Sequence, residues 1–274
     1  MKGKTLFITG ASRGIGRAIA LGAAKEGANV VIAAKSTEPH PKLPGTIHSV
    51  AEEVEAVGGR ALPLALDIRD EQAVAAAVAR AAEAFGGIDI LVNNASAISL
   101  TGTLETPVKR FDLMMSVNVR GTFVCSQACL PHLKASAQRG RNPHILTLAP
   151  PPSLEARWYK DHLAYSIAKY GMSLCVLGMA EEFRAAGIAV NALWPRTLIA
   201  TAALRLIPGI DPARARTPEI LADCAAIIFK RDARSCTGNF FIDEDLLAEE
   251  RIGGLARYAV TPGNTDFARD LFVD

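Results

Sequence analysis

Short apolar runs alternate with longer helical patterns along nearly the whole chain, and this alternation constrains the fold more than any other feature. The apolar runs lie at residues 5–9, 30–34, 61–66, 90–92, 144–148 and 189–193, with a seventh expected at 240–242. The helical patterns lie at residues 15–26, 50–57, 72–85, 111–133 and 163–185. Apolar strands separated by helices are typical of a parallel sheet covered on both faces. The sequence therefore predicts an α/β fold, a doubly wound parallel sheet of about seven strands in a single domain over residues 1–274.

Composition and charge argue against several classes of protein. Half of the residues are hydrophobic, 21% are charged and the formal net charge is +2, as in an ordinary globular domain. No basic run is interleaved with aromatic residues, so we expect no nucleic-acid partner. No apolar run approaches the ~20 residues that span a bilayer, so we expect no membrane span.

The five cysteines are odd in number, scattered, and not preceded by a signal peptide. This pattern favours reduced thiols and a cytoplasmic location over a disulfide framework. Cys125 and Cys129 share a helical face, but no further ligand follows at metal-site spacing. We therefore expect core packing at these two residues and no metal site.

Two segments are longer than a minimal doubly wound fold needs, and long loops in compact domains are often functional. The first, residues 35–49, contains three prolines. The second, residues 197–217, is predicted to cover an apolar substrate, although its side chains could instead fill the core or a subunit contact. Its apolar residues include Leu198, Ile199, Leu204, Leu206, Ile207 and Ile210.

Three glycines, Gly10, Gly14 and Gly16, lie where the first apolar run gives way to a helical pattern. Bare backbone can approach phosphate groups, and a helix N-terminus favours their negative charge. Glycines between a strand and a helix therefore predict a dinucleotide site, the alternative being a plain glycine turn. Asp67 and Asn94 follow later strands and should open on the same crevice, unless they only cap a helix or form a turn.

The residues after the second apolar run favour NADP over NAD. An acid at this place usually binds the ribose 2′-hydroxyl, whereas a basic residue accommodates a 2′-phosphate. Here the run ends in Ala34-Lys35-Ser36, and Arg13 lies inside the glycine segment. The alternative is that Lys35 is only a solvated loop residue.

Tyr165 and Lys169 are four residues apart, so their side chains share one helical face. A free phenol has a pKa of about 10 and is a poor acid–base group at neutral pH. A fixed ammonium group beside it favours the phenolate and lowers that pKa, as general acid–base catalysis requires. The pair alone is weak evidence, and the upstream glycines strengthen it.

Together these features resemble the short-chain dehydrogenases/reductases, a family of Rossmann-type oxidoreductases. The resemblance covers nearly the whole chain and rests on segment 9–16, Asp67, Asn93-Asn94-Ala95, Asn118 and Tyr165-x-x-x-Lys169. Segments 39–43, 94–100 and 192–195 are closer still to the family's hydroxysteroid dehydrogenase-like protein 2 group. Members of that group can carry a C-terminal sterol-carrier-like domain, for which this chain is expected to be too short.

The resemblance implies a role for each matched residue. Tyr165 would exchange a proton with the substrate oxygen, and Lys169 would bind the nicotinamide ribose and lower the pKa of Tyr165. Asn118 would continue the proton relay by holding a helix carbonyl and a water. Asp67 would contact the adenine and Asn94 the adjacent ribose. The expected cofactor-binding residues are Gly10, Ser12, Arg13, Gly14, Ile15, Gly16, Lys35, Asp67, Asn94, Ala95, Lys169, Pro195, Thr197 and Ile199, with Thr201 near the nicotinamide.

One residue of the family pattern is missing. The family places a serine about 13 residues before the tyrosine, where it stabilises negative charge on the substrate oxygen. Positions 149–152 read Ala-Pro-Pro-Pro here, and none of these side chains donates a hydrogen bond. Ser153 is the candidate substitute, and an ordinary loop hydroxyl is an equal alternative for it. Ser96, Thr147 and His162 are further candidates.

We therefore predict an enzyme that transfers hydride between NADP(H) and a carbonyl or alcohol, with Tyr165 as general acid/base and an apolar small molecule as substrate. The alternatives are a reductase of activated carbon–carbon double bonds and an NADP-binding regulator or scaffold with little turnover. The helices at 111–133 and 163–185 are apolar on more than one face, which favours a homodimer or homotetramer, as the family also suggests.

Overall fold

The computed structural model describes residues 1–41, 43–204 and 209–274. Within these ranges seven parallel strands form one sheet in the order β3-β2-β1-β4-β5-β6-β7. The strands are β1 (Thr5–Thr9), β2 (Asn29–Ala34), β3 (Arg60–Ala65), β4 (Ile90–Asn93), β5 (His144–Thr147), β6 (Ala189–Trp194) and β7 (Phe240–Ile242). The predicted doubly wound sheet is confirmed, and the strand order reverses between β1 and β4, where such sheets bind ligands.

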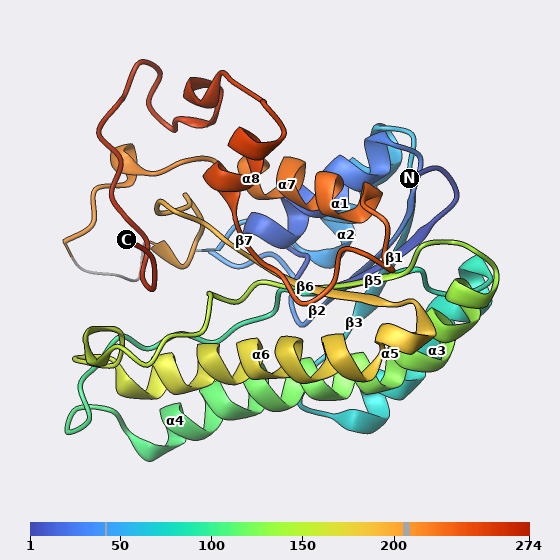
Figure 1. The fold of residues 1–274 in the computed structure, drawn as a ribbon, viewed down its shortest axis with the longest axis horizontal. Helices are drawn as coiled ribbons and strands as arrows, with labels where there is room; N and C mark the ends of the chain where they lie inside the picture. Colours follow the sequence, from blue (N-terminus) through green and yellow to red (C-terminus); the bar gives the residue numbers. More distant parts are fainter. Residues whose placement is uncertain (42, 205–208) are drawn as a thin grey trace.

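Helices cover both faces of the sheet (Figure 1). One layer contains α1 (Gly14–Lys25), α2 (Ile47–Ala56), α7 (Glu219–Lys230) and α8 (Asp243–Glu249). The other contains α3 (Glu71–Phe85), α4 (Val108–Met114), α5 (Gly121–Gln138) and α6 (Leu163–Glu182). Along β1, Leu6 and Ile8 pack into the first layer while Phe7 packs into the second. Because both faces of the strand are buried, its sequence is continuously apolar rather than alternating.

The predicted helix over residues 111–133 is found within an unbroken helical stretch, residues 108–138, which is not α-helical throughout. A π-helical turn, Met115–Arg120, separates α4 from α5. Asn118 lies in this turn and is completely buried. Its side chain accepts a hydrogen bond from the backbone N–H of Ala97 at 2.7 Å and donates one to the Ala97 carbonyl at 3.0 Å. The turn thus fixes a buried amide against the segment that follows β4, and π-turns inside helices are frequent at functional sites.

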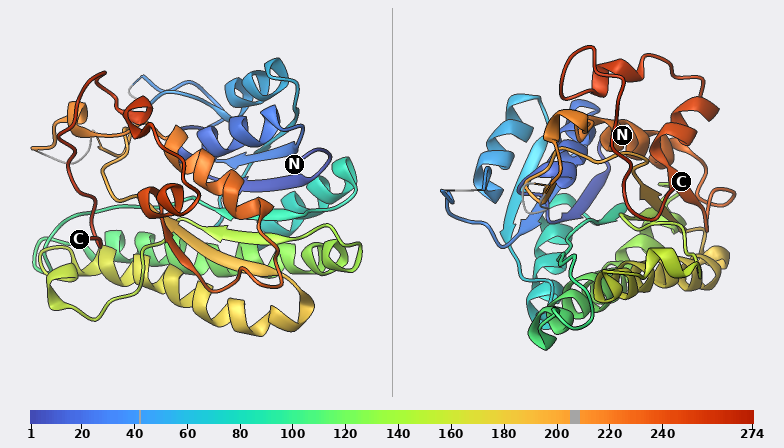
Figure 2. Two further views of the ribbon diagram at one scale, coloured as in Figure 1. Left: turned by 45° about the horizontal axis from the view of Figure 1, so that its top comes forward. Right: turned by 90° about the vertical axis from the view of Figure 1, so that its left-hand side faces the viewer.

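The loop after β6 and the end of the chain come together at the carboxyl edge of the sheet (Figures 1 and 2). Leu198 N–H donates to the Ala268 carbonyl at 2.9 Å, and Asp270 N–H donates to the Arg196 carbonyl at 3.0 Å. Residues 264–274, called the tail below, are therefore held along residues 196–198. Leu206 and Ile207 of the predicted substrate loop, and Lys42 of the second crossover, lie outside the described residues.

Among the described residues, α6 is the one helix long and apolar enough to cross a membrane, but 61% of its apolar window is buried inside the molecule, as in a core helix.

Cys125 and Cys129 are completely buried in the hydrophobic core of the layer that contains α6. No group of three or more metal-ligating side chains occurs in the part of the chain that the structure describes.

Candidate active site

The glycine segment forms a tight turn between β1 and α1. Gly10 and Gly14 have φ angles of +66° and +57°, in the left-handed region that favours glycine. A Cβ on Gly10 would come 2.9 Å from the Cα of Ala95, and one on Gly16 would come 2.6 Å from Asn94 Nδ2. The N-cap of α1, Arg13, makes no side-chain capping bond. A bare turn beside an uncapped helix start fits a phosphate group of a dinucleotide.

Asn94 holds this turn against the end of β4. Its Nδ2 donates to the carbonyls of Thr9 at 2.9 Å and Gly10 at 3.1 Å. Thr9 Oγ1 in turn accepts from the backbone N–H groups of Asn94 and Ala95 at 3.0 and 3.1 Å. The Asn94 amide therefore positions the turn, and its contact with a ribose stays a prediction.

A cleft of about 520 Å³ runs from the glycine turn across the ends of β2 and β3. Arg13 donates to Ser36 Oγ at 2.8 Å and to the Pro44 and Gly45 carbonyls at 2.8 and 3.1 Å. It thereby ties the crossover loop after β2 to the glycine turn. The expected cofactor residues that line the cleft are Gly10, Ser12, Arg13, Gly14, Ile15, Lys35, Asp67, Asn94 and Ala95.

Asp67 lies between two cations at the floor of this cleft. Its carboxylate is 3.2 Å from Lys35 Nζ and 2.5 Å from an Arg69 guanidinium nitrogen. The hydrogen bonds from Arg69, with a smaller effect of Lys35, hold the pKa of this carboxyl well below its usual range. Asp67 is therefore ionised at neutral pH and neutralises part of the Lys35 charge.

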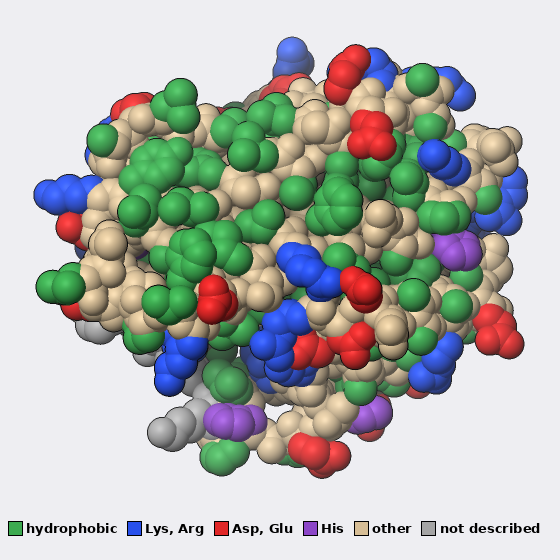
Figure 3. Space-filling model, turned by 90° about the horizontal axis from the view of Figure 1, so that it is seen from below, with side chains coloured by type: hydrophobic (Ala, Val, Ile, Leu, Met, Phe, Trp, Pro, Cys, Tyr) green, Lys and Arg blue, Asp and Glu red, His purple; other side chains and the backbone are tan. Residues whose placement is uncertain are grey.

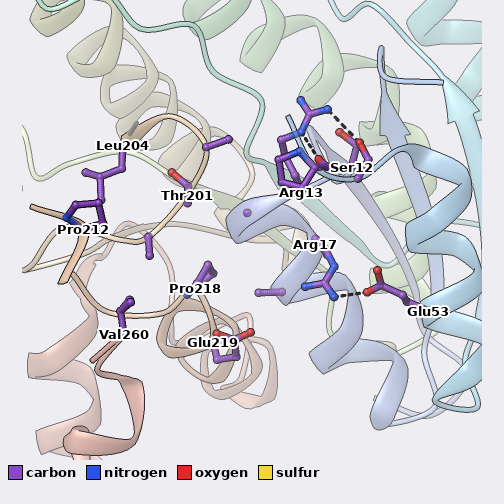
Figure 4. Close-up of a pocket in the computed structure, with 16 residues that line it drawn as sticks. Ser12, Arg13, Arg17, Glu53, Thr201, Leu204, Pro212, Pro218, Glu219 and Val260 are labelled. Atoms are coloured by element: carbon purple, nitrogen blue, oxygen red, sulfur yellow. Dashed lines mark hydrogen bonds and ion pairs between the residues drawn. The ribbon is translucent and has the colours of Figure 1, made fainter. Parts of the chain in front are cut away.

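A neighbouring hollow of about 510 Å³ lies beside the glycine turn (Figure 4). It shares Ser12, Arg13, Gly14, Thr201 and Ala202 with the cleft, and it also contains the ion pair between Arg17 and Glu53. Neither Tyr165 nor Lys169 lines it. The acid–base residues instead belong to a third space, which shares Thr201 and Leu204 with this hollow.

Tyr165 and Lys169 line a chamber of about 180 Å³ that adjoins the cleft. Most of its walls are apolar. The other lining residues are Ile15, Asn94, Ser96, Ile98, Leu148, Trp194, Pro195, Leu198, Ile199, Thr201, Ala203, Leu204 and Asp270. The predicted pair, Pro195, Ile199 and Thr201 thus lie together. Thr197 does not line the chamber, and its Oγ1 is buried with no partner in the described part of the chain.

Burial dominates the electrostatics of the pair. The Tyr165 side chain is 6% exposed, and its hydroxyl has no hydrogen-bond partner among the described residues. Lys169 Nζ donates to the Leu148 carbonyl and lies 4.8 Å from the centre of the Trp194 ring. Burial lowers the pKa of Lys169 to about 7. It raises the pKa of the Tyr165 phenol, and Asp270 acts in the same direction. The predicted lowering of the Tyr165 pKa by Lys169 is therefore not found here, because desolvation dominates.

Ser153 does not reach the chamber. Its Oγ accepts a hydrogen bond from the Glu155 N–H at 3.1 Å, and its carbonyl accepts one from the Tyr159 hydroxyl at 2.6 Å. Of the other candidates for the missing serine, Ser96 lines the chamber, whereas Thr147 and His162 do not. The proline run therefore leaves the chamber without the expected serine hydroxyl.

The tail contributes to the chamber in a way that the sequence did not predict. Asp270 lines the chamber, and Phe272 is 4% exposed with a φ of +72°. The rings that contact Phe272, with centroids 5.1 to 6.2 Å away, belong to Trp158, His162, Tyr165, Tyr170 and Trp194. The only signal in the sequence is the short apolar run at residues 271–273, which does not reveal where the tail packs.

Comparison with known proteins agrees with this architecture. A family model described as short chain dehydrogenase matches residues 4–206. The chain is 61% identical over 275 residues to hydroxysteroid dehydrogenase-like protein 2 of Rattus norvegicus, covering 100% of this chain and 51% of the rat protein. A crystal structure from Xanthomonas campestris has a TM-score of 0.95 and 59% identity, covering 100% of this chain and 98% of that one. A short chain dehydrogenase from Mycobacterium thermoresistibile has a TM-score of 0.92 and 54% identity, covering 100% and 96%.

The chain therefore belongs to the short chain dehydrogenase family, whose members are oxidoreductases that bind a nicotinamide dinucleotide and act on small molecules. Within that family it is similar to hydroxysteroid dehydrogenase-like protein 2, and it spans about half the length of the rat relative.

Proposed function

We propose that this chain catalyses reversible hydride transfer between NADP(H) and the carbonyl or alcohol carbon of an apolar small molecule. The observation that carries the proposal is the chamber, where the unpartnered Tyr165 hydroxyl and the buried Lys169 line one wall. A bound nicotinamide would supply or accept the hydride. The residues of the chain would bind the substrate, exclude water and move the proton.

Tyr165 is the proton donor when a carbonyl is reduced. As hydride reaches the carbonyl carbon, the substrate oxygen takes the phenolic proton, and in oxidation the phenolate takes it back. The phenol is protonated at neutral pH, as the reductive direction requires, and burial makes it a weaker acid than a free phenol. The Lys169 ammonium, held by the Leu148 carbonyl and the Trp194 ring, would favour the phenolate left behind.

The charges at the far end of the cleft support NADP rather than NAD. Lys35 and Ser36, rather than an acid, directly follow β2, and the Arg13 guanidinium lies against Ser36 Oγ at that place. Arginine recognises phosphate through paired, charge-assisted hydrogen bonds. Since Lys35 is partly neutralised by Asp67, Arg13 and Ser36 should make the larger contribution to a 2′-phosphate.

An apolar substrate is supported by the walls around Tyr165. Ile98, Leu198 and Leu204 line the chamber, and Leu198 and Leu204 pack into a small cluster with Ala215. Such a surface favours the hydrocarbon part of a ligand, while a few polar groups orient its reacting end.

The test combines a substrate panel with two tyrosine variants. The wild type should reduce decanal or a methyl ketone of equal length with NADPH. Tyr165→Phe should lower kcat by ~10²–10⁴, the usual contribution of general acid–base catalysis, while its affinity for NADPH stays unchanged. Tyr170→Phe is the matched control, because the Tyr170 hydroxyl is buried without a partner in the described structure and does not line the chamber.

Full activity of Tyr165→Phe would show that this phenol is not the proton donor. Turnover of a conjugated enoyl substrate alone would favour the double-bond reductase. NADPH binding without turnover of any compound in the panel would favour a regulator.

A further inference from the structure

The chamber lacks the serine donor that the family pattern places before the tyrosine, and its lining hydroxyls besides Tyr165 are those of Ser96 and Thr201. A second hydrogen-bond donor to the substrate oxygen stabilises the charge that develops there, beside the acid that protonates it. The residues at 149–152 offer no side-chain donor, and the Ser153 hydroxyl is bonded to Glu155 outside the chamber. This inference rests on the proposed function and asks which residue supplies that donor.

Asp270 is held at the chamber by the backbone around it. Its N–H donates to the Arg196 carbonyl at 3.0 Å, and the next carbonyl, of Leu271, accepts from Trp194 Nε1 at 2.8 Å. Phe272 then anchors the tail among five aromatic rings. These contacts fix Asp270 on a chamber wall that it shares with Tyr165 and Lys169.

One carboxyl oxygen of Asp270 is free to meet a ligand. Oδ1 accepts a hydrogen bond from the Leu271 N–H at 2.7 Å. Oδ2 has no partner among the described residues. The geometry therefore leaves one oxygen oriented by the protein and the other available in the chamber.

Burial, rather than the neighbouring charges, favours the neutral form of Asp270. Tyr165 and Lys169 face it from α6, and the buried Asp243 lies nearby at the start of α8. The guanidinium groups of Arg196 and Arg269 donate hydrogen bonds to the Asp274 carbonyl. Arg196 also donates one to the Asp245 carboxylate. Burial raises the pKa of Asp270 to about 7, against the lowering effects of the Leu271 N–H and of Lys169, and Asp243 adds a smaller effect in the same direction as burial.

The chemistry of reduction also disfavours an ionised carboxylate at this position. A carboxylate would repel the negative charge building on the substrate oxygen and would disfavour the Tyr165 phenolate. A protonated carboxyl does neither and carries an O–H to donate. Protonated carboxylic acids are known to act as oxyanion donors in apolar sites.

We propose that Asp270, in its protonated form, donates a hydrogen bond to the reacting oxygen of the substrate in place of the missing serine. Asp270 keeps its proton throughout. The transferred proton comes from Tyr165 and the hydride from the nicotinamide, so the balance of the reaction is unchanged.

The kinetic test compares Asp270→Ala and Asp270→Asn with the wild type, using decanal and NADPH at pH 6, where Lys169 keeps its charge. Asp270→Ala should lower kcat by ~10²–10³, as loss of one oxyanion donor does, with unchanged NADPH affinity. Asp270→Asn should retain most of the activity. Its Oδ1 would keep the Leu271 bond, which places the amide N–H₂ at the free position. Asp266→Asn is the control, since Asp266 pairs with Arg214 at the surface of the same tail.

An Asp270→Ala variant as active as the wild type would overturn the proposal. An Asp270→Asn variant as impaired as Asp270→Ala would also overturn it, because kcat would then not depend on a hydrogen-bond donor at position 270.

A second readout does not depend on turnover. In protein labelled with ¹³C at the aspartate carboxyls, the resonance missing from Asp270→Asn should titrate near pH 7. Titration near the ordinary aspartate value of about 3.9 would overturn the proposal. If the wild type reduces no carbonyl in the panel, the proposed function fails, and the resonance still reports the protonation of Asp270.

Discussion

At the scale of single residues, the two cations near the end of β2 have different surroundings. Lys35 faces Asp67, whereas Arg13 reaches Ser36 Oγ. Arg13→Ala should therefore weaken NADPH binding by ~10-fold or more, since hydrogen bonds to charged groups contribute ~1.5–3 kcal/mol. NADH binding should change little, and Lys35→Ala should have the smaller effect on NADPH. Fluorescence titration of each cofactor measures these affinities, and tighter binding of NADH than NADPH to the wild type would contradict the assignment.

Asp243 gives a prediction about stability and pH. It is completely buried, and Oδ1 accepts hydrogen bonds from the backbone N–H groups of Arg196 and Glu244. Oδ2 has no partner in the described structure. Burial raises the pKa of this carboxyl from 3.8 to about 6. Between these values the folded state binds more protons than the unfolded state, so this group lowers the free energy of unfolding as pH rises.

Asp243→Asn removes that dependence. Relative to the wild type, the variant should gain stability as pH rises from about 4 to about 6, by up to ~3 kcal/mol, and then level off. Urea unfolding at several pH values measures the difference. Asp245→Asn, an exposed neighbour, serves as control. A difference that stays constant with pH would show that Asp243 is ionised in the folded state throughout this range.

At the scale of elements, a helical glycine sets the distance between α6 and the π-helical turn. A Cβ on Gly171 would come 2.6 Å from Val119 Cγ2, whereas one on Gly178, in the same helix, meets nothing within 4 Å. Val119 is β-branched and has little rotamer freedom to move aside. Gly171→Ala should therefore destabilise the protein by ~1–3 kcal/mol. Gly178→Ala should stabilise it by ~0.5–1 kcal/mol, because alanine favours the helix. Urea unfolding of both variants tests this, and equal effects would contradict the packing argument.

The elements also show what a sequence can predict. All seven strands were found. The central strands are buried on both faces and so are apolar for most of their length, β3 and β7 keep apolar runs although they are only partly buried, and glycines end the helices between the first strands. The π-helical turn at Met115–Arg120 was missed, because this helix is apolar on more than one face and the shift that one inserted residue makes in its pattern does not stand out. Asn118 was recognised through the family resemblance, but its bonds to Ala97 depend on that turn.

The site was only partly predictable for a related reason. Local sequence patterns indicate the chemistry of the glycines and of the pair Tyr165 and Lys169. The glycines lie between a strand and a helix, and the pair has a helical spacing. Asp270 and Phe272 have no such pattern, because their place depends on backbone pairing with residues 196–198 and on rings from distant segments. The raised pKa of Tyr165 also follows from burial in the folded chamber rather than from its spacing to Lys169.

At the scale of the whole molecule, the layer of α4, α5 and α6 presents apolar side chains on its outer face (Figure 3). Phe111, Phe123, Leu174 and Leu177 are 37%, 49%, 62% and 42% exposed. We propose that these helices pack against a second copy of the chain, giving a homodimer or homotetramer. Contiguous apolar patches of this kind commonly mark subunit contacts.

A charge placed in this face should break the assembly. Leu174→Glu should lower the mass measured by light scattering to that of a smaller species, because an unpaired carboxylate is costly to bury. Leu154→Glu is the control, since Leu154 is 96% exposed and belongs to the loop after β5 rather than to these helices. A wild type that is monomeric at micromolar concentration would contradict the proposed contact.

The two ends of the candidate site come from distant parts of the chain, the glycine turn from residues 10–16 and the acid–base pair from α6. During synthesis, the glycine turn leaves the ribosome long before α6. In the interval the ribosome makes β4, which lies between β1 and β5 in the sheet. A nascent chain therefore has no complete dinucleotide-binding site until its second half has packed against the first. Capture of the dinucleotide would then act on the finished molecule, and by mass action it would hold both halves in the native state.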